Sequence, residues 1–218
     1  AQELIELDTF TYTAHARALR CHSAFVYVGD NQDRCFSYSP ITKELVLINL
    51  VQPELRDVEV TKLGVLWMQT GDTGKVFLNS GIQPVLFPST NGLGVFLDGI
   101  AVKDSIVFAM GDPINGEFEI YRTTNGGTNW TLVSGANIPN PLSGEFGYTR
   151  QLDVVGNSVW FSTNKGRIFH STDKGATWAV YTSPILDFAG ANISANFSFS
   201  SASTGYIVTN GGAVYKST

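Results

Sequence analysis

Charged residues are scarce in this sequence: 14 Lys or Arg and 19 Asp or Glu make up 15% of its 218 residues, whereas an average soluble domain has about 25%. Disorder requires high charge and few aromatic residues, and a coiled coil requires abundant Ala, Glu, Lys and Leu, so both classes are excluded. Aromatic residues reach 12%, and 22 residues are glycine. This composition indicates packed β-structure with tight turns.

A basic surface and long apolar runs are also absent. The net charge is −5 and the pI is ≈5.1, so the chain has no basic field to attract nucleic acid. The longest apolar runs, such as that at residues 106–110, and shorter ones such as 45–48, fall far short of the about 20 residues that a membrane helix needs. Residues 1–3 show no signal-peptide pattern. We expect neither a nucleic-acid partner nor membrane insertion.

Cysteine and histidine are too few for a metal or disulfide framework. The two cysteines, Cys21 and Cys35, form neither a disulfide scaffold nor a zinc motif. The hairpin pattern described below tends to place them at opposite ends of one sheet, which leaves their pairing open. The three histidines lie far apart without ligand spacing and are expected in turns or on the surface. We expect no metal site and no cofactor.

An internal repeat organises the chain. Residues 123–130 and 171–178 both fit the pattern S/T-x-D/N-x-G-x-x-W and begin 48 residues apart. Weaker copies are expected near 37–44, 79–86 and 217–218. Ser37, Asn79, Thr123, Ser171 and Ser217 thus mark five units, spaced 42, 44, 48 and 46 residues apart.

Each unit predicts four antiparallel strands, and no segment shows helical periodicity. A β-prone run is followed by a second run, and Asn, Asp and Gly, which tolerate positive φ, close the next hairpin. Four strands in about 45 residues is the size of one β-propeller blade, so we predict an all-β propeller with five visible blades. The predicted first strands are 12–19, 58–62, 95–102, 151–155 and 196–200; the second strands are 24–28, 65–69, 105–110, 159–162 and 206–209.

The repeated motif is interpreted as a turn staple between the third and fourth strands. Its Ser or Thr hydroxyl and its Asp or Asn side chain accept hydrogen bonds from turn amides, its Gly permits an unusual backbone angle, and its Trp packs in the seam between blades. A calcium loop is disfavoured, because each copy has at most one acid and no closing Glu. The structural residues are Thr123, Asn125, Gly127 and Trp130 in one copy, and Ser171, Asp173, Gly175 and Trp178 in the other.

These two octapeptides resemble the Asp-box, or BNR repeat. The resemblance implies a propeller with the motif at the blade periphery, away from the ligand face. Families with this repeat include sialidases, sortilin-type receptors, xyloglucan-active glycoside hydrolases and photosystem II assembly-factor-like propellers. Residues 156–161, followed by a turn, a strand and the motif, are most similar to the assembly-factor-like group. The Arg-Ile-Pro motif of sialidases does not occur.

Two arrangements of the whole domain, residues 1–218, are compatible with five units. A closed five-bladed ring would need residues 3–7 to supply the last strand of the fifth blade. Asp-box propellers resemble six- or seven-bladed rings instead, and the chain stops inside a copy of the motif. We therefore favour a fragment of a larger propeller.

Gly-Asp pairs recur in equivalent predicted turns and provide one set of candidate site residues. Their carboxylates could form a ring that faces a cation, a sugar or a partner, whereas repeated turn chemistry is the favoured alternative. The three acids are Asp30, Asp72 and Asp112.

The long inter-blade loop 134–149 is the best candidate for a binding loop, because loops this long are functional or mobile. Glu145 and Tyr148, followed by Arg150, are its candidate binding residues. No spacing in the sequence pairs two carboxylates for glycoside hydrolysis, and no phosphate loop or nucleophile elbow is present. No catalytic residue is assigned.

The sequence thus favours a secreted, extracellular or periplasmic, non-enzymatic propeller that binds a protein or carbohydrate ligand through its loop face. A glycoside hydrolase of the sialidase or xyloglucanase type is the first alternative. An adhesin or surface-layer module of a longer chain is the second.

Overall fold

The computed structural model describes residues 14–50, 54–72, 74–79, 86–88, 96–185, 196–209 and 212–217. Within these ranges the chain forms five antiparallel sheets, each built from consecutive strands, and one short 3-10 helix. Blade 1 contains β1 (Ala16–His22), β2 (Phe25–Asp30), β3 (Arg34–Ser39) and β4 (Glu44–Leu50); blade 2 contains β5 (Leu55–Val60), β6 (Leu66–Thr70), β7 (Val76–Asn79) and β8 (Leu86–Pro88). Blade 3 contains β9 (Leu97–Lys103), β10 (Ile106–Ile114), β11 (Glu117–Thr123) and β12 (Thr131–Leu132), followed by η1 (Gly135–Asn137); blade 4 contains β13 (Gly147–Val155), β14 (Ser158–Thr163), β15 (Arg167–Ser171) and β16 (Ala179–Thr182); blade 5 contains β17 (Asn196–Phe199), β18 (Gly205–Val208) and β19 (Val214–Lys216).

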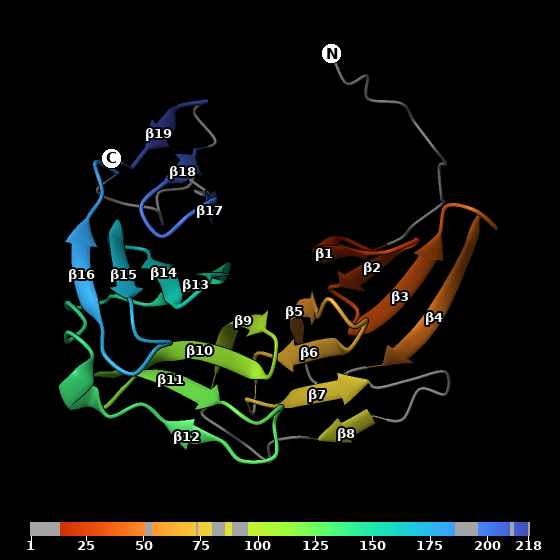
Figure 1. Ribbon diagram of the computed structural model, residues 1–218, viewed down its shortest axis with the longest axis horizontal. Helices are drawn as coiled ribbons and strands as arrows, with labels where there is room; N and C mark the ends of the chain where they lie inside the picture. The colour runs from red at the N-terminus through yellow and green to blue at the C-terminus, as the bar shows by residue number, and fades with distance from the viewer. Residues whose placement is uncertain are drawn as a thin grey trace.

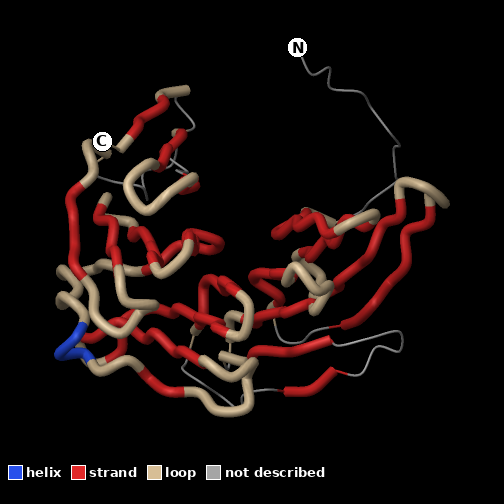
Figure 2. The backbone as a smooth tube through the Cα atoms, viewed as in Figure 1, coloured by secondary structure: helices blue, strands red, loops and turns tan. Residues whose placement is uncertain are grey.

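The five sheets are the blades of a β-propeller, as the repeat predicted. The first strands of successive blades, β1, β5, β9, β13 and β17, lie side by side along the inside of the arc (Figure 1). The described part of blade 5 stands across an open side of the arc from blade 1. Strands dominate the backbone, and η1 lies on the outer side (Figure 2). Among the described residues, no helix has the length and apolar character to span a bilayer.

Apolar clusters between neighbouring blades form the core. Blades 1 and 2 bury one cluster that includes Leu55 and Met68, and blades 3 and 4 bury a larger one around Phe108, Phe118 and Phe161. Comparable clusters fill the other two junctions. A sheet that is covered on both faces needs apolar side chains on both faces, which accounts for the low proportion of charged residues.

The face of blade 1 that looks away from blade 2 differs from these junctions. It carries a cavity of ≈340 Å³ with an apolar lining that includes Leu19, Val28 and Phe36. Leu19 is 52% exposed and Leu47, level with it across the sheet, is 47% exposed. Blade 1 therefore presents toward the open side of the arc the same type of surface that the other blades bury.

The structure corrects one predicted turn. Gly111 and Asp112 do not close a hairpin, because β10 continues to Ile114 through a β-bulge and the turn falls at Asn115 and Gly116. The bulge arises where Asp112 N donates to the carbonyl of Phe96 (3.2 Å) and prolongs the pairing with the start of β9. A Cβ at position 111 would lie 2.2 Å from that carbonyl oxygen, so only glycine fits there.

Two other predicted boundaries shift in the structure. Gly29 and Asp30 are the last residues of β2 rather than turn residues. The inner strand of blade 4 starts at Gly147, earlier than the predicted strand 151–155, so the predicted loop 134–149 ends inside β13. Cross-strand hydrogen bonding thus extends into segments whose composition is typical of turns.

The two cysteines are free thiols in this structure. Cys35 is completely buried in the junction between blades 1 and 2, whereas Cys21 is exposed and pairs across the sheet with Val26, away from Cys35. Burial, with a smaller effect of the Asp30 charge, raises the pKa of the Cys35 thiol to about 12. Cys35 is therefore a core residue without thiolate reactivity at neutral pH.

Candidate functional site

Charged side chains gather where the inner strands begin. The inner strands of neighbouring blades run in the same direction, so their first residues all lie on the same face of the propeller. Arg17 stands at the start of β1, Glu54 and Arg56 flank the start of β5, and Asp98 is the second residue of β9. Asp112 joins them from the bulge of β10. We call these five residues the inner-strand cluster.

Glu54 links blades 1 and 2 in this cluster. Its Oε1 lies 2.7 Å from Arg56 Nη2 and 3.6 Å from Arg17 Nη2, and Arg17 Nη1 also donates to the carbonyl of Leu55 (2.9 Å). Glu54 has a φ of 60°, a backbone conformation that non-glycine residues rarely adopt and that concentrates at functional sites. The three charged side chains remain 24–29% exposed, so a ligand can reach them.

Arg56 also connects blade 2 to blade 3. Its guanidinium lies over the ring of Phe96, 4.7 Å from the centroid, as in a cation–π contact. Gly71 makes this stacking possible, since a Cβ there would lie 3.0 Å from both Arg56 Nε and Phe96 Cζ. The Arg56 and Phe96 pair forms a flat, cationic surface beside the carboxylate of Glu54.

Asp98 and Asp112 form a carboxyl pair at the bulge. Asp98 is 5% exposed, and Asp112 Oδ1 accepts a hydrogen bond from Gly147 N (3.1 Å). Burial is the main cause that raises the pKa of Asp98 to about 8, the charge and hydrogen bond of Asp112 add to it, and Arg56 opposes it. Burial and the neighbouring charge therefore both favour the protonated form of Asp98.

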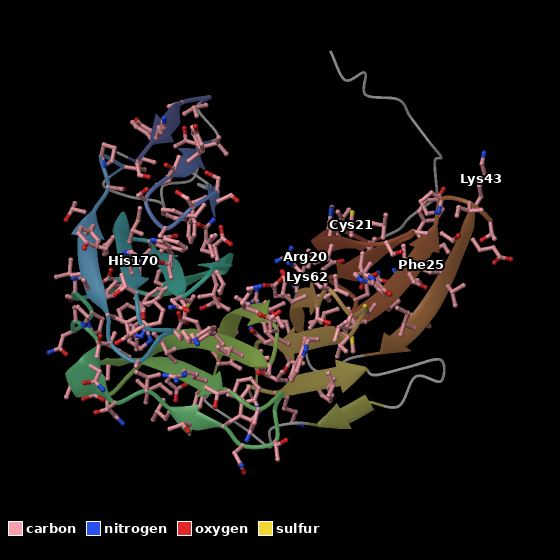
Figure 3. All side chains as sticks on the ribbon, viewed as in Figure 1. Arg20, Cys21, Phe25, Lys43, Lys62 and His170 are labelled. Carbon is pink, nitrogen blue, oxygen red and sulfur yellow. The ribbon has the colours of Figure 1, made fainter. Side chains whose placement is uncertain are left out.

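A second set of charges lies further along the inner strands. Arg20, which Figure 3 labels on the inner side of blade 1, is ion-paired with Glu59 and lies 3.5 Å from Asp57 Oδ1 (Figure 3). Burial acts to lower the pKa of Arg20, but the carboxylates of Asp57 and Glu59 outweigh it and raise this pKa. Burial raises the pKa of Glu59 despite its pairing with Arg20.

Two inner-strand acids tie neighbouring blades together. Asp57 accepts hydrogen bonds from its own neighbour Val58 N (2.9 Å) and from Ile100 N on β9 of the next blade (3.2 Å). Asp153 repeats the arrangement: it accepts from Val154 N (2.8 Å) and from a backbone amide of β17 (2.7 Å). Neighbouring blades are separate sheets and share no backbone hydrogen-bond ladder. Each carboxylate therefore satisfies a backbone amide of the next blade that would otherwise lack an acceptor.

The structure does not bring the three predicted Gly-Asp carboxylates into a ring. Asp30 is fully buried and accepts hydrogen bonds from Gln32 N and from the backbone and side chain of Arg34. Asp72 is exposed after the end of β6. Asp112 pairs with Asp98. Of the three acids, only Asp112 belongs to the inner-strand cluster.

Glu145, predicted as a binding residue, fastens its own loop. It accepts hydrogen bonds from Thr163 Oγ1, Leu142 N (2.7 Å) and Arg167 Nε (2.9 Å), and Arg167 Nη2 completes the ion pair at 2.8 Å. Its carboxylate is 5% exposed or less. Tyr148 and Arg150 lie near the start of β13, and their side chains are outside the described part of the structure.

The motif turns have matching hydrogen bonds in blades 3 and 4. Thr123 Oγ1 accepts from the amides of Asn125 (3.3 Å) and Gly127 (3.1 Å), and Ser171 Oγ accepts from those of Asp173 (3.3 Å) and Gly175 (2.8 Å). Both turns lie at the opposite end of the sheets from the inner-strand cluster, since they join the third and fourth strands. Of the weaker copies, residues 80–85 and 218 lie outside the described residues.

The two motif tryptophans pack in successive blade junctions. Trp130 stands edge-on to Trp67 of blade 2, with ring centroids 6.3 Å apart. Trp178 is 7% exposed, joins the cluster between blades 3 and 4, and stands edge-on to Phe161 at 5.2 Å. Its Nε1 donates to the carbonyl of Gly175 (3.2 Å). Each tryptophan therefore links a motif turn to an apolar junction.

Asp173 differs from Asn125 at the same motif position by its charge. The slight desolvation of its carboxylate acts to raise its pKa, but hydrogen bonds from Thr177, Ser171 and Ala176 outweigh it and lower this pKa to about 2. The lowered pKa means that the ionised form stabilises the turn. This stabilisation is present above the ordinary value of 3.8 and is lost as the pH falls through about 2.

We therefore expect Asp173→Asn to make the protein less sensitive to acid. Asn keeps the hydrogen bonds to backbone amides, as Asn125 does with Asn129 N (3.0 Å), but it does not titrate. Urea midpoints of wild type and variant should differ most near neutral pH and converge as the pH falls below about 4. A difference that stays constant with pH would contradict the assignment. Asn125→Asp is the matched reciprocal variant, expected to add acid sensitivity.

Sequence reasoning missed most of the inner-strand cluster. A signal existed for Asp98, because it is the single charge in the apolar run 95–102, and a lone acid in a predicted buried strand indicates a special environment. Arg56 and Glu54 carried no comparable signal, since they lie in a segment composed like an ordinary loop. No group of three or more His, Cys, Asp or Glu side chains in the described part of the chain could hold a metal ion.

The comparisons with known proteins show the fold. No family model and no curated protein matches the sequence. Among solved structures, YCF48 bound to D1 peptide has 14% identity and a TM-score of 0.64 over 96% of this chain and 66% of that chain. An inactive variant of virginiamycin B lyase from Staphylococcus aureus with quinupristin has 13% identity and a TM-score of 0.64 over 98% and 73%.

A third solved structure, the extracellular domain of BT4673 from B. thetaiotaomicron, has 10% identity and a TM-score of 0.66 over 97% of this chain and 28% of that chain. This chain therefore spans just under two thirds of the YCF48 chain and a smaller part of BT4673. At such low identities the likeness is one of architecture. The chain has the β-propeller fold.

Proposed function

We propose that this chain is a non-enzymatic propeller that binds an extended peptide segment of a partner protein at the inner-strand cluster. The observation that carries the proposal is the convergence of two partly exposed arginine side chains and two neighbouring carboxyl groups from three blades at one end of the inner strands. Ligands of propellers enter where loops and inner strands meet. The partner proposed here is a protein rather than a nucleic acid.

The chemistry of the cluster defines the segment. Arg56 is paired with Glu54 through Nη2, and a guanidinium has several further N–H donors suited to a second carboxylate. The Arg56 and Phe96 pair offers a flat surface to a side chain or peptide plane. When a cation approaches the Asp98 and Asp112 pair, it lowers the free energy needed to ionise the protonated carboxyl, so both carboxyls can then be negatively charged. A peptide segment with a Lys or Arg next to an Asp or Glu could therefore contact both the carboxyl pair and the arginine side chains of the inner-strand cluster.

Two structural neighbours support a protein partner. YCF48 is described as bound to the D1 peptide, and another neighbour is the complex of nidogen and laminin, with 15% identity and a TM-score of 0.62. The neighbours also include a lyase, so the fold by itself supports either binding or catalysis. The choice of binding rests on the site chemistry of this chain.

A random-peptide display selection on the purified protein tests the proposal. We expect the enriched peptides to share a basic residue beside an acidic one, and to lose on the order of tenfold in affinity or more with the double variant Asp98→Asn, Asp112→Asn. Asp104→Asn is the matched control, because Asp104 has a 70% exposed side chain in the turn that follows β9. Enriched peptides that bind the double variant as tightly as wild type would contradict the proposal.

Glycoside hydrolysis remains a second candidate with weaker support. Glycosidases hold two carboxyls roughly 5–10 Å apart around a sugar, whereas Asp98 is buried beside Asp112 and Glu145 is occupied by Arg167 and Thr163. Turnover of aryl sialosides or β-glucan oligosaccharides that Asp112→Asn abolishes would favour the enzyme over the binding protein. We also propose an extracellular or periplasmic location, which the extracellular neighbour BT4673 supports.

A further inference from the structure

A second cavity lies on the outer side of the propeller, between blade 3 and the motif turn of blade 4. Its volume is ≈470 Å³, within the range of about 300–1,000 Å³ that small-ligand sites occupy. This region lies around β12 (Figure 1) and η1, the blue segment in Figure 2, away from the inner strands. Its lining combines Arg122 with the side chains of Asn125, Asn129, Ser134 and Asn137, and Ala176 closes it from blade 4.

Arg122 is the chemically distinctive residue in this lining. Six arginines have described side chains, and five of them are ion-paired with a carboxylate. The pairs are Arg17 with Glu54, Arg20 with Glu59, Arg34 with Asp30, Arg56 with Glu54, and Arg167 with Glu145. Arg122 has no carboxylate or hydrogen-bond partner among the described residues, although it is half-buried on β11 opposite Thr131. Arg122 therefore lines the cavity without a partner for its donors among the described residues.

The rest of the lining is neutral and rich in hydrogen-bonding groups. None of the cavity residues is acidic. The nearby acid of the blade 4 turn, Asp173, is held by Ala176 N (3.0 Å), Thr177 N (2.9 Å) and Thr177 Oγ1 (2.7 Å). Asn125 Oδ1 accepts from Asn129 N (3.0 Å), which leaves its amide NH₂ free to donate. The cavity therefore combines one positive charge with amides and hydroxyls.

We infer that this cavity binds an acidic sugar, with the sugar carboxylate on Arg122 and its hydroxyls on the surrounding amides. A guanidinium is matched to a carboxylate by its planar fork of donors. Asparagine side chains both donate and accept, which matches ring hydroxyls. Leu132 and Val133 supply an apolar wall for the carbon face of the ring. This site is separate from the inner-strand cluster and does not depend on the peptide-binding proposal.

Titration of the protein with D-glucuronate, followed by NMR of the protein amides, tests the inference. Glucuronate should shift resonances of β11, β12 and η1. D-glucose, which has a neutral hydroxymethyl group in place of the carboxylate, should bind at least about tenfold more weakly. Arg122→Gln should lose glucuronate binding by a similar factor and keep its amide spectrum otherwise intact. Lys216→Gln, which removes one positive charge from β19 of blade 5, is the matched control and should bind as wild type does.

Three results would overturn the inference. The first is glucose binding equal to glucuronate binding, which would remove the role of the carboxylate. The second is unchanged glucuronate affinity in Arg122→Gln. The third is equal affinity for acetate and glucuronate, since it would show that the neutral lining contributes nothing. Glucuronate should also bind the Asp98→Asn, Asp112→Asn double variant normally, so that failure of one site is distinguishable from failure of the other.

Discussion

Asp57→Ala is expected to destabilise the protein by about 3 kcal/mol, because it removes one member of a buried charged network. Asp57 is completely buried between blades 1, 2 and 3. Its loss leaves the amides of Val58 and Ile100 without their acceptor and takes one of two carboxylates from Arg20. Unpaired buried donors each cost about 1–3 kcal/mol. Urea unfolding measures this difference in the free energy of unfolding, provided that the dependence of that free energy on urea concentration is the same for both proteins.

Asp57→Asn separates the charge from the hydrogen bonds in this prediction. The two amides donate to different oxygens of Asp57, so Asn retains an acceptor for one of them and offers no charge to Arg20. The cost of Asp57→Asn should therefore lie between wild type and Asp57→Ala. Asp153→Ala should also destabilise, since Asp153 makes the same type of tie between blades 4 and 5. A loss of stability below about 1 kcal/mol for Asp57→Ala, the size of one ordinary hydrogen bond, would show that the hydrogen bonds of Asp57 between blades contribute little to the stability of the propeller.

The Asp98 and Asp112 pair should make wild type less stable as the pH rises, in the opposite sense to Asp173. The folded pKa of Asp98, about 8, lies above its ordinary value of 3.8, so the folded state binds a proton that the unfolded chain releases. This contribution is fully present below about pH 4 and is lost as the pH rises through about 8. The groups that set it are burial, Asp112, Arg56 and Glu54.

Asp98→Asn should abolish this dependence. Its amide can donate to Asp112 in place of the shared proton, and it carries no charge at any pH. Urea midpoints should be measured for both proteins from about pH 5 to about pH 9. Because both proteins share all other titrating groups, the midpoint of wild type should fall relative to that of the variant as the pH rises. Equal slopes for the two proteins would show that Asp98 is already ionised at neutral pH in the folded state.

The blade architecture was predictable because its signals are local. Each blade has its own turns and its own β-prone runs, and the two full motif copies, with Trp130 and Trp178, set the period. Alternation and turn chemistry act over a few residues, so a single sequence is enough to reveal them. The weakest predictions were strand ends, as at Gly111, where a bulge depends on the carbonyl of Phe96.

The site depended on contacts that a sequence does not display. Asp98 and Asp112 meet only because the β10 bulge shifts the register between two strands. Arg56 meets Phe96 across a junction between blades. Glu145 was identified as a notable acid, but its pairing with Arg167 and Thr163 links it to the blade 4 sheet rather than to a ligand. Residue type alone does not distinguish an acidic side chain that stabilises a loop by an internal ion pair from one that binds a ligand.

Proton release on peptide binding would show directly that a peptide docks on the Asp98 and Asp112 pair. If a basic side chain of the peptide docks on the carboxyl pair, we expect it to displace a proton from Asp98, because a nearby cation favours the ionised carboxylate. Calorimetric titration of the tightest selected peptide, in buffers of different ionisation enthalpy, should report release of up to about one proton for wild type and for the control Asp104→Asn, and none for Asp98→Asn. Tight binding without proton release in wild type would show that the peptide does not dock a basic side chain on the Asp98 and Asp112 pair.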